Sequence, residues 1–135
     1  MRYLLDTNIC IHLIERQPAS VSARFRALRQ GDVVMSAVTY AELRYGVERC
    51  AGPDRAVADR ALNSLIEDIP VLPLDARAGD AYGVLRAAVR DRKRDALDRL
   101  IAGHALSRGL ILVTNNEADF KDYPGLLLEN WVAGA

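Results

Sequence analysis

The segment DALDRLIAGHALSRGLILVTNN (95–116) decides the fold class of this chain of 135 residues. Its first part predicts a helix that Gly109 ends as a C′ glycine, and LIAGHAL (100–106) inside that helix carries no formal charge when its histidine is neutral. A helix that is apolar nearly all round is a buried helix. The strand LILV (110–113) follows at once, and polar residues follow the strand.

The same alternation of helical patterns and short apolar runs extends over the whole chain. Runs of three or four apolar residues predict strands, and the longer segments between them predict helices. The expected strands are 3–5, 33–35, 71–74, 110–113 and 126–128, and the expected helices are 8–16, 18–29, 37–49, 53–68, 76–91 and 95–108, with a helical turn at 117–121. Apolar strands that alternate with helices indicate a parallel α/β sheet with both faces covered.

Length and composition indicate a single domain, 1–135, and exclude several classes of protein. Half of the residues are hydrophobic, which is too many for a disordered chain. No uncharged apolar stretch reaches the ~18 residues of a membrane span, and Asp6 interrupts the apolar start that a signal peptide would need. Two cysteines cannot form a disulfide framework, so we expect a cytoplasmic protein with no membrane partner.

The net charge is zero, with 18 basic and 18 acidic residues, which argues mildly against binding nucleic acid through bulk electrostatics. Basic residues are nevertheless concentrated in the segments 16–29 and 86–99. Solvated helix faces are the simpler interpretation of both segments, although arginine also suits bidentate contacts to phosphate.

Three acidic residues occupy places that a parallel sheet would bring to one edge, where ligands bind in such folds. Asp6 follows the first strand, Glu42 lies in the first turns of the helix after the second strand, and Asp98 lies at the start of the apolar helix. Each has a structural alternative. Asp6 could be an N-cap, Glu42 could form a capping box with Thr39, and Asp98 could be a cap, although Asp95 is better placed to cap that helix.

A second polar group follows the strand 110–113, with Thr114 and Asn116 directly after it and Asp119 three residues later. A turn that caps the next helical segment is the structural alternative. Clustered acids repel one another unless a cation is present, and oxygen ligands suit Mg²⁺ or Mn²⁺. Metal-assisted phosphoryl transfer is the chemistry that needs such a site, because metals activate a water and neutralise the phosphate.

Five pieces of the sequence have an order and spacing that resemble the PIN-domain ribonucleases, and within them the VapC toxins of bacterial toxin–antitoxin pairs. The pieces are LLDTN (4–8), SAVTYAELRYGVER (36–49), DRLIAGHALSRGLILVTNN (98–116), ADF (118–120) and PGLLLENW (124–131). The resemblance covers almost the whole chain. It implies a PIN domain, a five-stranded parallel sheet in the order 3-2-1-4-5 flanked by helices, which agrees with the number of strands expected above.

The resemblance also implies roles for individual residues. Asp6, Glu42 and Asp98 match the acidic triad of the family, and Asp119 matches a less uniform fourth acid. All four are implied catalytic residues and metal ligands, with Glu42 either a ligand or the residue that positions a metal-bound water. Supporting polar roles are implied for Asn116, Thr114 and Asn8.

The implied activity is that of a Mg²⁺- or Mn²⁺-dependent endoribonuclease toxin. The implied partners are an RNA substrate, a second copy of the chain, a VapB-type antitoxin that covers the site, and operator DNA only through the antitoxin complex. The segment IAGHALSRGLILVTNN (101–116) is most similar to the subgroup that cuts initiator tRNA in the anticodon stem-loop. That subgroup often has a Gly- and Pro-containing loop before the third acid, where this chain has the basic stretch RDRKRDALD (90–98).

Two hypotheses of other classes remain beside this one. A receiver-type phosphoacceptor domain would need paired acids after the first strand and a lysine after the last, but Thr7 follows Asp6 and no lysine follows Leu128. Asp75 is therefore interpreted as an N-cap. A non-catalytic PIN-like binding module would keep the fold without the chemistry, and the intact set of acids argues against it.

Overall fold

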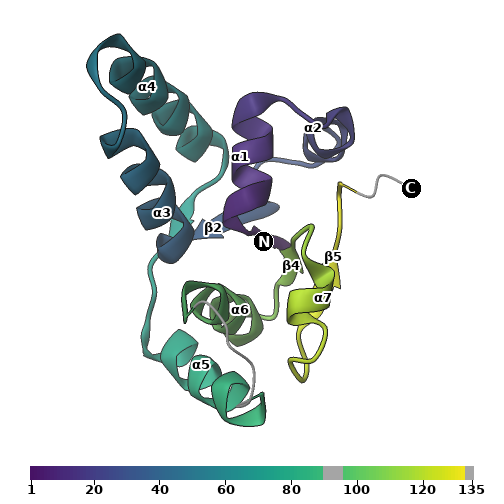
Figure 1. The fold of residues 1–135 in the computed structure, drawn as a ribbon. Coiled ribbons are helices and arrows are strands. Elements are labelled where there is room, and N and C mark those ends of the chain that lie inside the picture. The colour runs from purple at the N-terminus through teal and green to yellow at the C-terminus, as the bar shows by residue number, and fades with distance from the viewer. Residues whose placement is uncertain (90–95, 133–135) are drawn as a thin grey trace.

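The computed structural model describes residues 1–89 and 96–132, and within them a single parallel sheet has the order β3-β2-β1-β4-β5 (Figure 1). Its strands are β1 (Tyr3–Leu5), β2 (Val33–Ser36), β3 (Val71–Leu72), β4 (Ile111–Val113) and β5 (Leu127–Glu129). All neighbouring strands pair in parallel. The predicted PIN-type sheet and its strand order are therefore confirmed. A receiver domain would have the order 2-1-3-4-5, so this topology excludes that hypothesis.

The predicted helices are found with ends that differ by a few residues. They are α1 (Thr7–Glu15), α2 (Ala19–Arg26), α3 (Ala37–Glu48), α4 (Gly52–Asp68), α5 (Ala76–Ala88), α6 (Ala96–Arg108) and the short α7 (Glu117–Phe120). Asp75 is the predicted N-cap of α5, since its side chain accepts the N–H of Ala78 at 3.0 Å. The ends of two predicted helices, at 90–91 and 95, lie outside the described residues.

Alternate residues of each strand pack on opposite faces of the sheet, and all strand residues except Ser36 at the end of β2 and Glu129 at the end of β5 are apolar. Tyr3 and Leu5 belong to one buried cluster, which includes side chains of α1, α2 and α4, whereas Leu4 belongs to a second cluster with side chains of α5 and α6. Figure 1 shows these two groups of helices on the two sides of the sheet. Both faces are covered, as the apolar strands predicted.

Helix α6 is the buried helix that its composition predicted, and most of its middle turns are inaccessible to solvent. Gly109 follows it with φ +65°, which is the left-handed conformation of a C′ glycine. Gly103 lies where α6 packs closely on α5. A Cβ atom added there would lie 2.8 Å from the backbone nitrogen of Tyr82.

Candidate active site

The register of the sheet brings the predicted residues of two strand ends together. Leu5 pairs with Val113, so Asp6 and Thr114 lie side by side at the carboxyl edge, and the Asp6 N–H donates to the Val113 carbonyl at 3.0 Å. Ser36 ends β2 at the same level on the other side of Asp6. The strand ends thus form one polar edge.

Asp6 is buried, with 5% of its surface exposed, and it has a structural role as well as a place in the site. One carboxylate oxygen accepts the N–H of Ile9 at 2.9 Å, so Asp6 is the N-cap of α1. The carboxylate also accepts a hydrogen bond from the Thr114 side chain. The Thr114 hydroxyl oxygen accepts the N–H of Asn116 at 3.0 Å, which leaves its proton for Asp6.

The electrostatic surroundings of Asp6 favour a nearby cation. Burial raises the pKa of the Asp6 carboxyl above its ordinary value, and the negative charge of Glu42 adds to that increase. The hydrogen bonds from Thr114 and Ile9, and the charge of His12, lower the pKa. A positive ion beside this edge would stabilise the ionised form that burial disfavours.

Glu42 is held towards α1 by a hydroxyl group. Thr7 Oγ1 donates to Glu42 Oε1 at 2.7 Å and lies 3.4 Å from the hydroxyl of Thr39. The structural alternative for Glu42, a capping box with Thr39, is not found, because α3 begins earlier than Thr39: its N-cap is Ser36, which accepts the N–H of Val38 at 3.1 Å. Thr7 was not selected from the sequence, although its place beside Asp6 was an available signal.

The other predicted site residues lie at the starts of α6 and α7. Asp98 is half-buried in the first turn of α6, and Asp119 is half-buried in α7. Asn8 and Asn116 are exposed, and Asn116 stands at the N-cap position of α7 without a capping hydrogen bond from its side chain. Asp95, the alternative cap of α6, lies outside the described residues.

Within residues 1–89 and 96–132, no three or more His, Cys, Asp or Glu side chains are gathered closely enough to hold a metal ion. Mg²⁺ often takes only one or two protein carboxylates and completes its ligand set with waters and substrate phosphates. The oxygen donors of Asp6 and Glu42, with the raised pKa of the buried Asp6 carboxyl, fit a cation of that kind.

A cavity of about 810 Å³ opens beside Glu42. It lies between α1, α3 and the start of α6, and most of its lining is apolar, including Ile11, Tyr45 and Leu97. Leu97 directly precedes Asp98, so the cavity connects Glu42 with the region of the third predicted acid.

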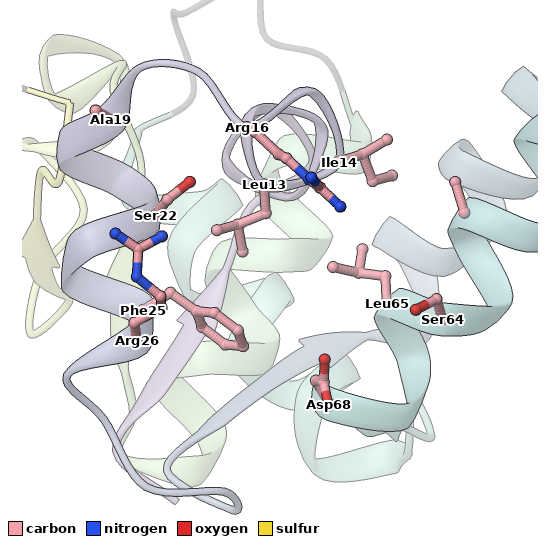
Figure 2. A pocket seen from close by; sticks show the side chains of 11 residues that line it. Leu13, Ile14, Arg16, Ala19, Ser22, Phe25, Arg26, Ser64, Leu65 and Asp68 are labelled. Carbon is pink, nitrogen blue, oxygen red and sulfur yellow. The ribbon is translucent and has the colours of Figure 1, made fainter.

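A second cavity, of about 490 Å³, lies between α1, α2 and α4 (Figure 2). Its inner wall is apolar, and Arg16 and Arg26 from the basic segment 16–29 lie around it with Asp68. None of the predicted acidic site residues lines this cavity. It is therefore a separate feature of the molecule.

The fold and the polar edge define a class of protein, and comparison with known sequences gives the same class. Residues 3–126 match the family model of the PIN domain. The chain is 44% identical over 133 residues to a protein of Shigella flexneri named tRNA(fMet)-specific endonuclease VapC, an alignment that covers 97% of this chain and 98% of the relative. The chain therefore belongs to the PIN-domain family.

Within that family the similarity is to VapC-type toxins, as the sequence predicted. The chain is 34% identical to Ribonuclease VapC2 of Haemophilus influenzae, over 98% of this chain and 99% of the relative. It superimposes with a TM-score of 0.87 on the structure of VapBC2 from Rickettsia felis bound to a promoter DNA fragment, at 32% identity over 97% of this chain and 99% of the other. The DNA-bound VapBC structure from Salmonella typhimurium gives the same TM-score at 34% identity, over 97% of this chain and 98% of that chain.

Proposed function

We propose that this chain is the toxin of a type II toxin–antitoxin pair and that it is an endoribonuclease that hydrolyses phosphodiester bonds. The observation that carries the proposal is the pair of carboxylates, Asp6 and Glu42, each held by a threonine hydroxyl at the carboxyl edge of a PIN-type sheet. Relatives that align over nearly the full chain and are named ribonucleases or endonucleases support it.

The proposed cofactor is Mg²⁺ or Mn²⁺, with Asp6, Glu42, Asp98 and Asp119 as the proposed catalytic residues and metal ligands. The geometry supports Asp6 and Glu42 as ligands, whereas Asp98 and Asp119 are proposed from the family resemblance, because the described residues do not gather three acids at one point. When bound, the ion would supply an activated water and neutralise charge on the phosphate. The protein holds the carboxylates in place: the helix cap and the Thr114 side chain orient Asp6. The Thr114 hydrogen bond also lowers the pKa of Asp6, so it favours the ionised form that a metal needs.

The proposed substrate is tRNA, cut in the anticodon stem-loop of the initiator species. The relative named tRNA(fMet)-specific endonuclease, at 44% identity, supports this choice. Cleavage of other RNA is the alternative, and the basic stretch 90–98 before Asp98 is the feature of this chain that would favour it. Residues 90–95 of that stretch lie outside the described structure.

The proposed protein partners are a VapB-type antitoxin and a second copy of the chain. Solved VapBC complexes with the same fold support the antitoxin. Exposed apolar side chains around the 810 Å³ cavity, Ile11, Tyr45, Leu74 and Leu97, also support a partner that covers the site. Operator DNA would be bound only through that complex.

Among the residues that the structure describes, no helix has both the length and the apolar character needed to cross a membrane. A cytoplasmic location remains a prediction.

Mapping of RNA 5′ ends in cells tests the proposal. Cells that express the wild-type chain should gain one dominant cut in the anticodon region of initiator tRNA, and cells that express Asp98→Asn should not. Asp80→Asn is the matched control, because it makes the same carboxylate-to-amide change at an exposed position of α5. Scattered cuts in mRNA would reject the tRNA assignment, and full cleavage by folded Asp98→Asn would reject the proposed site.

A further inference from the structure

A buried polar pair, Ser36 and His104, lies between the two helices that carry Glu42 and Asp98. His104 Nδ1 lies 2.7 Å from Ser36 Oγ, and each residue has 0% of its surface exposed. Ser36 is the N-cap of α3, the helix of Glu42, and His104 lies in α6, the helix of Asp98. The contact therefore joins the two acid-bearing helices directly.

The pair lies in a mainly apolar part of the core, where the Pro73 backbone is a further hydrogen-bond partner of His104. Val34 and Val38 lie two residues before and after Ser36, Ala102 and Ala105 are close to His104 in the sequence of α6, and all four are buried in the same apolar cluster. Polar groups in such a place cost free energy unless they are hydrogen-bonded, whereas apolar side chains would pack without that cost. What a hydrogen bond adds to packing is a preference for one alignment of the groups that it joins.

We assign the direction of the hydrogen bond from the other bonds that the two side chains make. Ser36 Oγ accepts the N–H of Val38 at 3.1 Å, and the His104 ring has a further hydrogen bond with the backbone of Pro73, which has no N–H and can only accept. The neutral ring has one proton, which we place on Nε2 for Pro73, so that Nδ1 accepts the proton of Ser36. Burial lowers the pKa of His104, with Arg108 adding to that effect and Asp75 opposing it, so the ring is neutral near neutral pH.

We propose that the Ser36–His104 hydrogen bond is a positioning element of the nuclease site. It fixes how far α6 lies along the start of α3, and so it sets the separation of the Glu42 and Asp98 carboxylates. A helix advances about 1.5 Å and turns roughly 100° with each residue, so even a small slip of α6 would carry Asp98 away from the edge of the sheet. This inference rests on the proposed function.

Variants of both partners test the inference. His104→Leu and Ser36→Ala remove the hydrogen bond, the double variant removes both partners, and His104→Asn keeps a polar atom near the position of Nδ1. Ile101→Val is the matched control, because it trims a buried side chain of the same helix and cluster without touching the pair.

We expect His104→Leu and Ser36→Ala each to lower kcat for RNA cleavage by about 10–100-fold, with little change in KM, as for residues that orient metal ligands. The double variant should lose no more than either single variant, and His104→Asn should recover part of the activity. Ile101→Val should keep the wild-type kcat. If His104→Leu keeps its kcat and only melts earlier, or if the two losses add, the pair is merely structural and the inference is overturned.

Two measurements remain decisive if the wild-type chain cleaves no RNA, a result that would reject the proposed function alone. The ¹⁵N shifts of the His104 ring should show Nδ1 as an acceptor in the wild type and should change in Ser36→Ala; a proton on Nδ1 would overturn the inferred direction. Mn²⁺ should raise the melting temperature of the wild type and of Ile101→Val, and much less that of His104→Leu. An equal rise in all three proteins would overturn the inference.

Discussion

Replacement of Gly103 by alanine is expected to push α5 and α6 apart. The added Cβ would lie 2.8 Å from the nitrogen and 3.0 Å from the Cα of Tyr82, and 3.2 Å from the carbonyl oxygen of Ala78. All three are backbone atoms, so no side-chain rotation can relieve the contact. The helices must separate locally by about 0.6 Å before the closest contact reaches an ordinary 3.4 Å.

The expected magnitude is the balance of two opposing effects. Overpacking of a well-packed contact typically costs about 1–3 kcal/mol, while alanine is favoured over glycine inside a helix by about 1 kcal/mol. We therefore expect Gly103→Ala to lower the free energy of unfolding by about 1 kcal/mol, or the melting temperature by roughly 3–5 °C. Gly83 on α5 is the control, because a Cβ added there meets nothing within 4 Å. Gly83→Ala should stabilise the protein by about 0.5–1 kcal/mol.

Urea unfolding followed by the fluorescence of Trp131 measures both changes, because this single tryptophan is buried and is exposed on unfolding. The two variants should shift the midpoint in opposite directions with unchanged m-values. Gly103→Ala should also cleave RNA more slowly, because Gly103 shares α6 with Asp98, whereas Gly83→Ala should not. A Gly103→Ala protein as stable as the wild type, or a destabilised Gly83→Ala, would refute the close-packing argument.

Three further predictions concern the site and the thiols. Asp6→Asn should abolish RNA cleavage and stabilise the fold at neutral pH. Because the pKa of buried Asp6 is raised in the folded state, its ionisation opposes folding. The gain in the free energy of unfolding of Asp6→Asn should therefore vanish below about pH 3.8 and grow as the pH rises through the raised pKa. Unfolding curves against pH check this, and a gain that is equal at every pH contradicts it. Thr7→Val removes the 2.7 Å hydrogen bond to Glu42 and should lower kcat about tenfold in single-turnover assays, with recovery in Thr7→Ser; an unchanged kcat would remove Thr7 from the site. Burial raises the pKa of the Cys10 thiol, so a thiol reagent should modify half-buried Cys50 in the native protein and Cys10 only on unfolding; two fast-reacting thiols would disprove the burial.

The sheet could be predicted because its buried strands are runs of apolar residues, which can be recognised in the sequence. Each interior strand is covered on both faces, so a run such as Tyr3–Leu5 is apolar at every position and is bounded by residues that end it. The burial of helix α6 could be predicted for the same reason, since its apolar residues lie all round the helix axis. The strand order came from the resemblance to a family, because the pattern of a single strand does not say which strands are its neighbours.

The candidate acids could be predicted from their places after strands. For Asp6, however, the helix cap and the place in the site were treated as alternatives, and the structure shows both. A carboxylate has two oxygens, and in the structure one of them caps α1 while the side chain also takes part in the polar edge. The contacts that hold the site together could not be predicted. Thr7 and Glu42 are 35 residues apart and Ser36 and His104 are 68 residues apart, and periodicity reports which face of an element is buried, not which distant side chain it meets.

Within the zero net charge of the chain, two groups of acids can be distinguished among the described residues: acids paired with arginines and acids held by hydroxyl groups. Arg44 and Arg55 bind Glu48, and Arg44 also binds Asp59, so these arginines are neutralised on the outer surface of α3 and α4. Such exposed pairs contribute little to stability, but they compete with phosphate for the guanidinium groups. Asp6 and Glu42, in contrast, are held by threonine hydroxyls, and neither forms an ion pair with an arginine of the described residues. A site built in this way keeps its negative charge for a metal ion, and the positive charge that meets a phosphate would then come from that ion. Charge neutrality of the whole chain is therefore compatible with RNA cleavage at one edge of the sheet, although it argues against tight non-specific binding of nucleic acid.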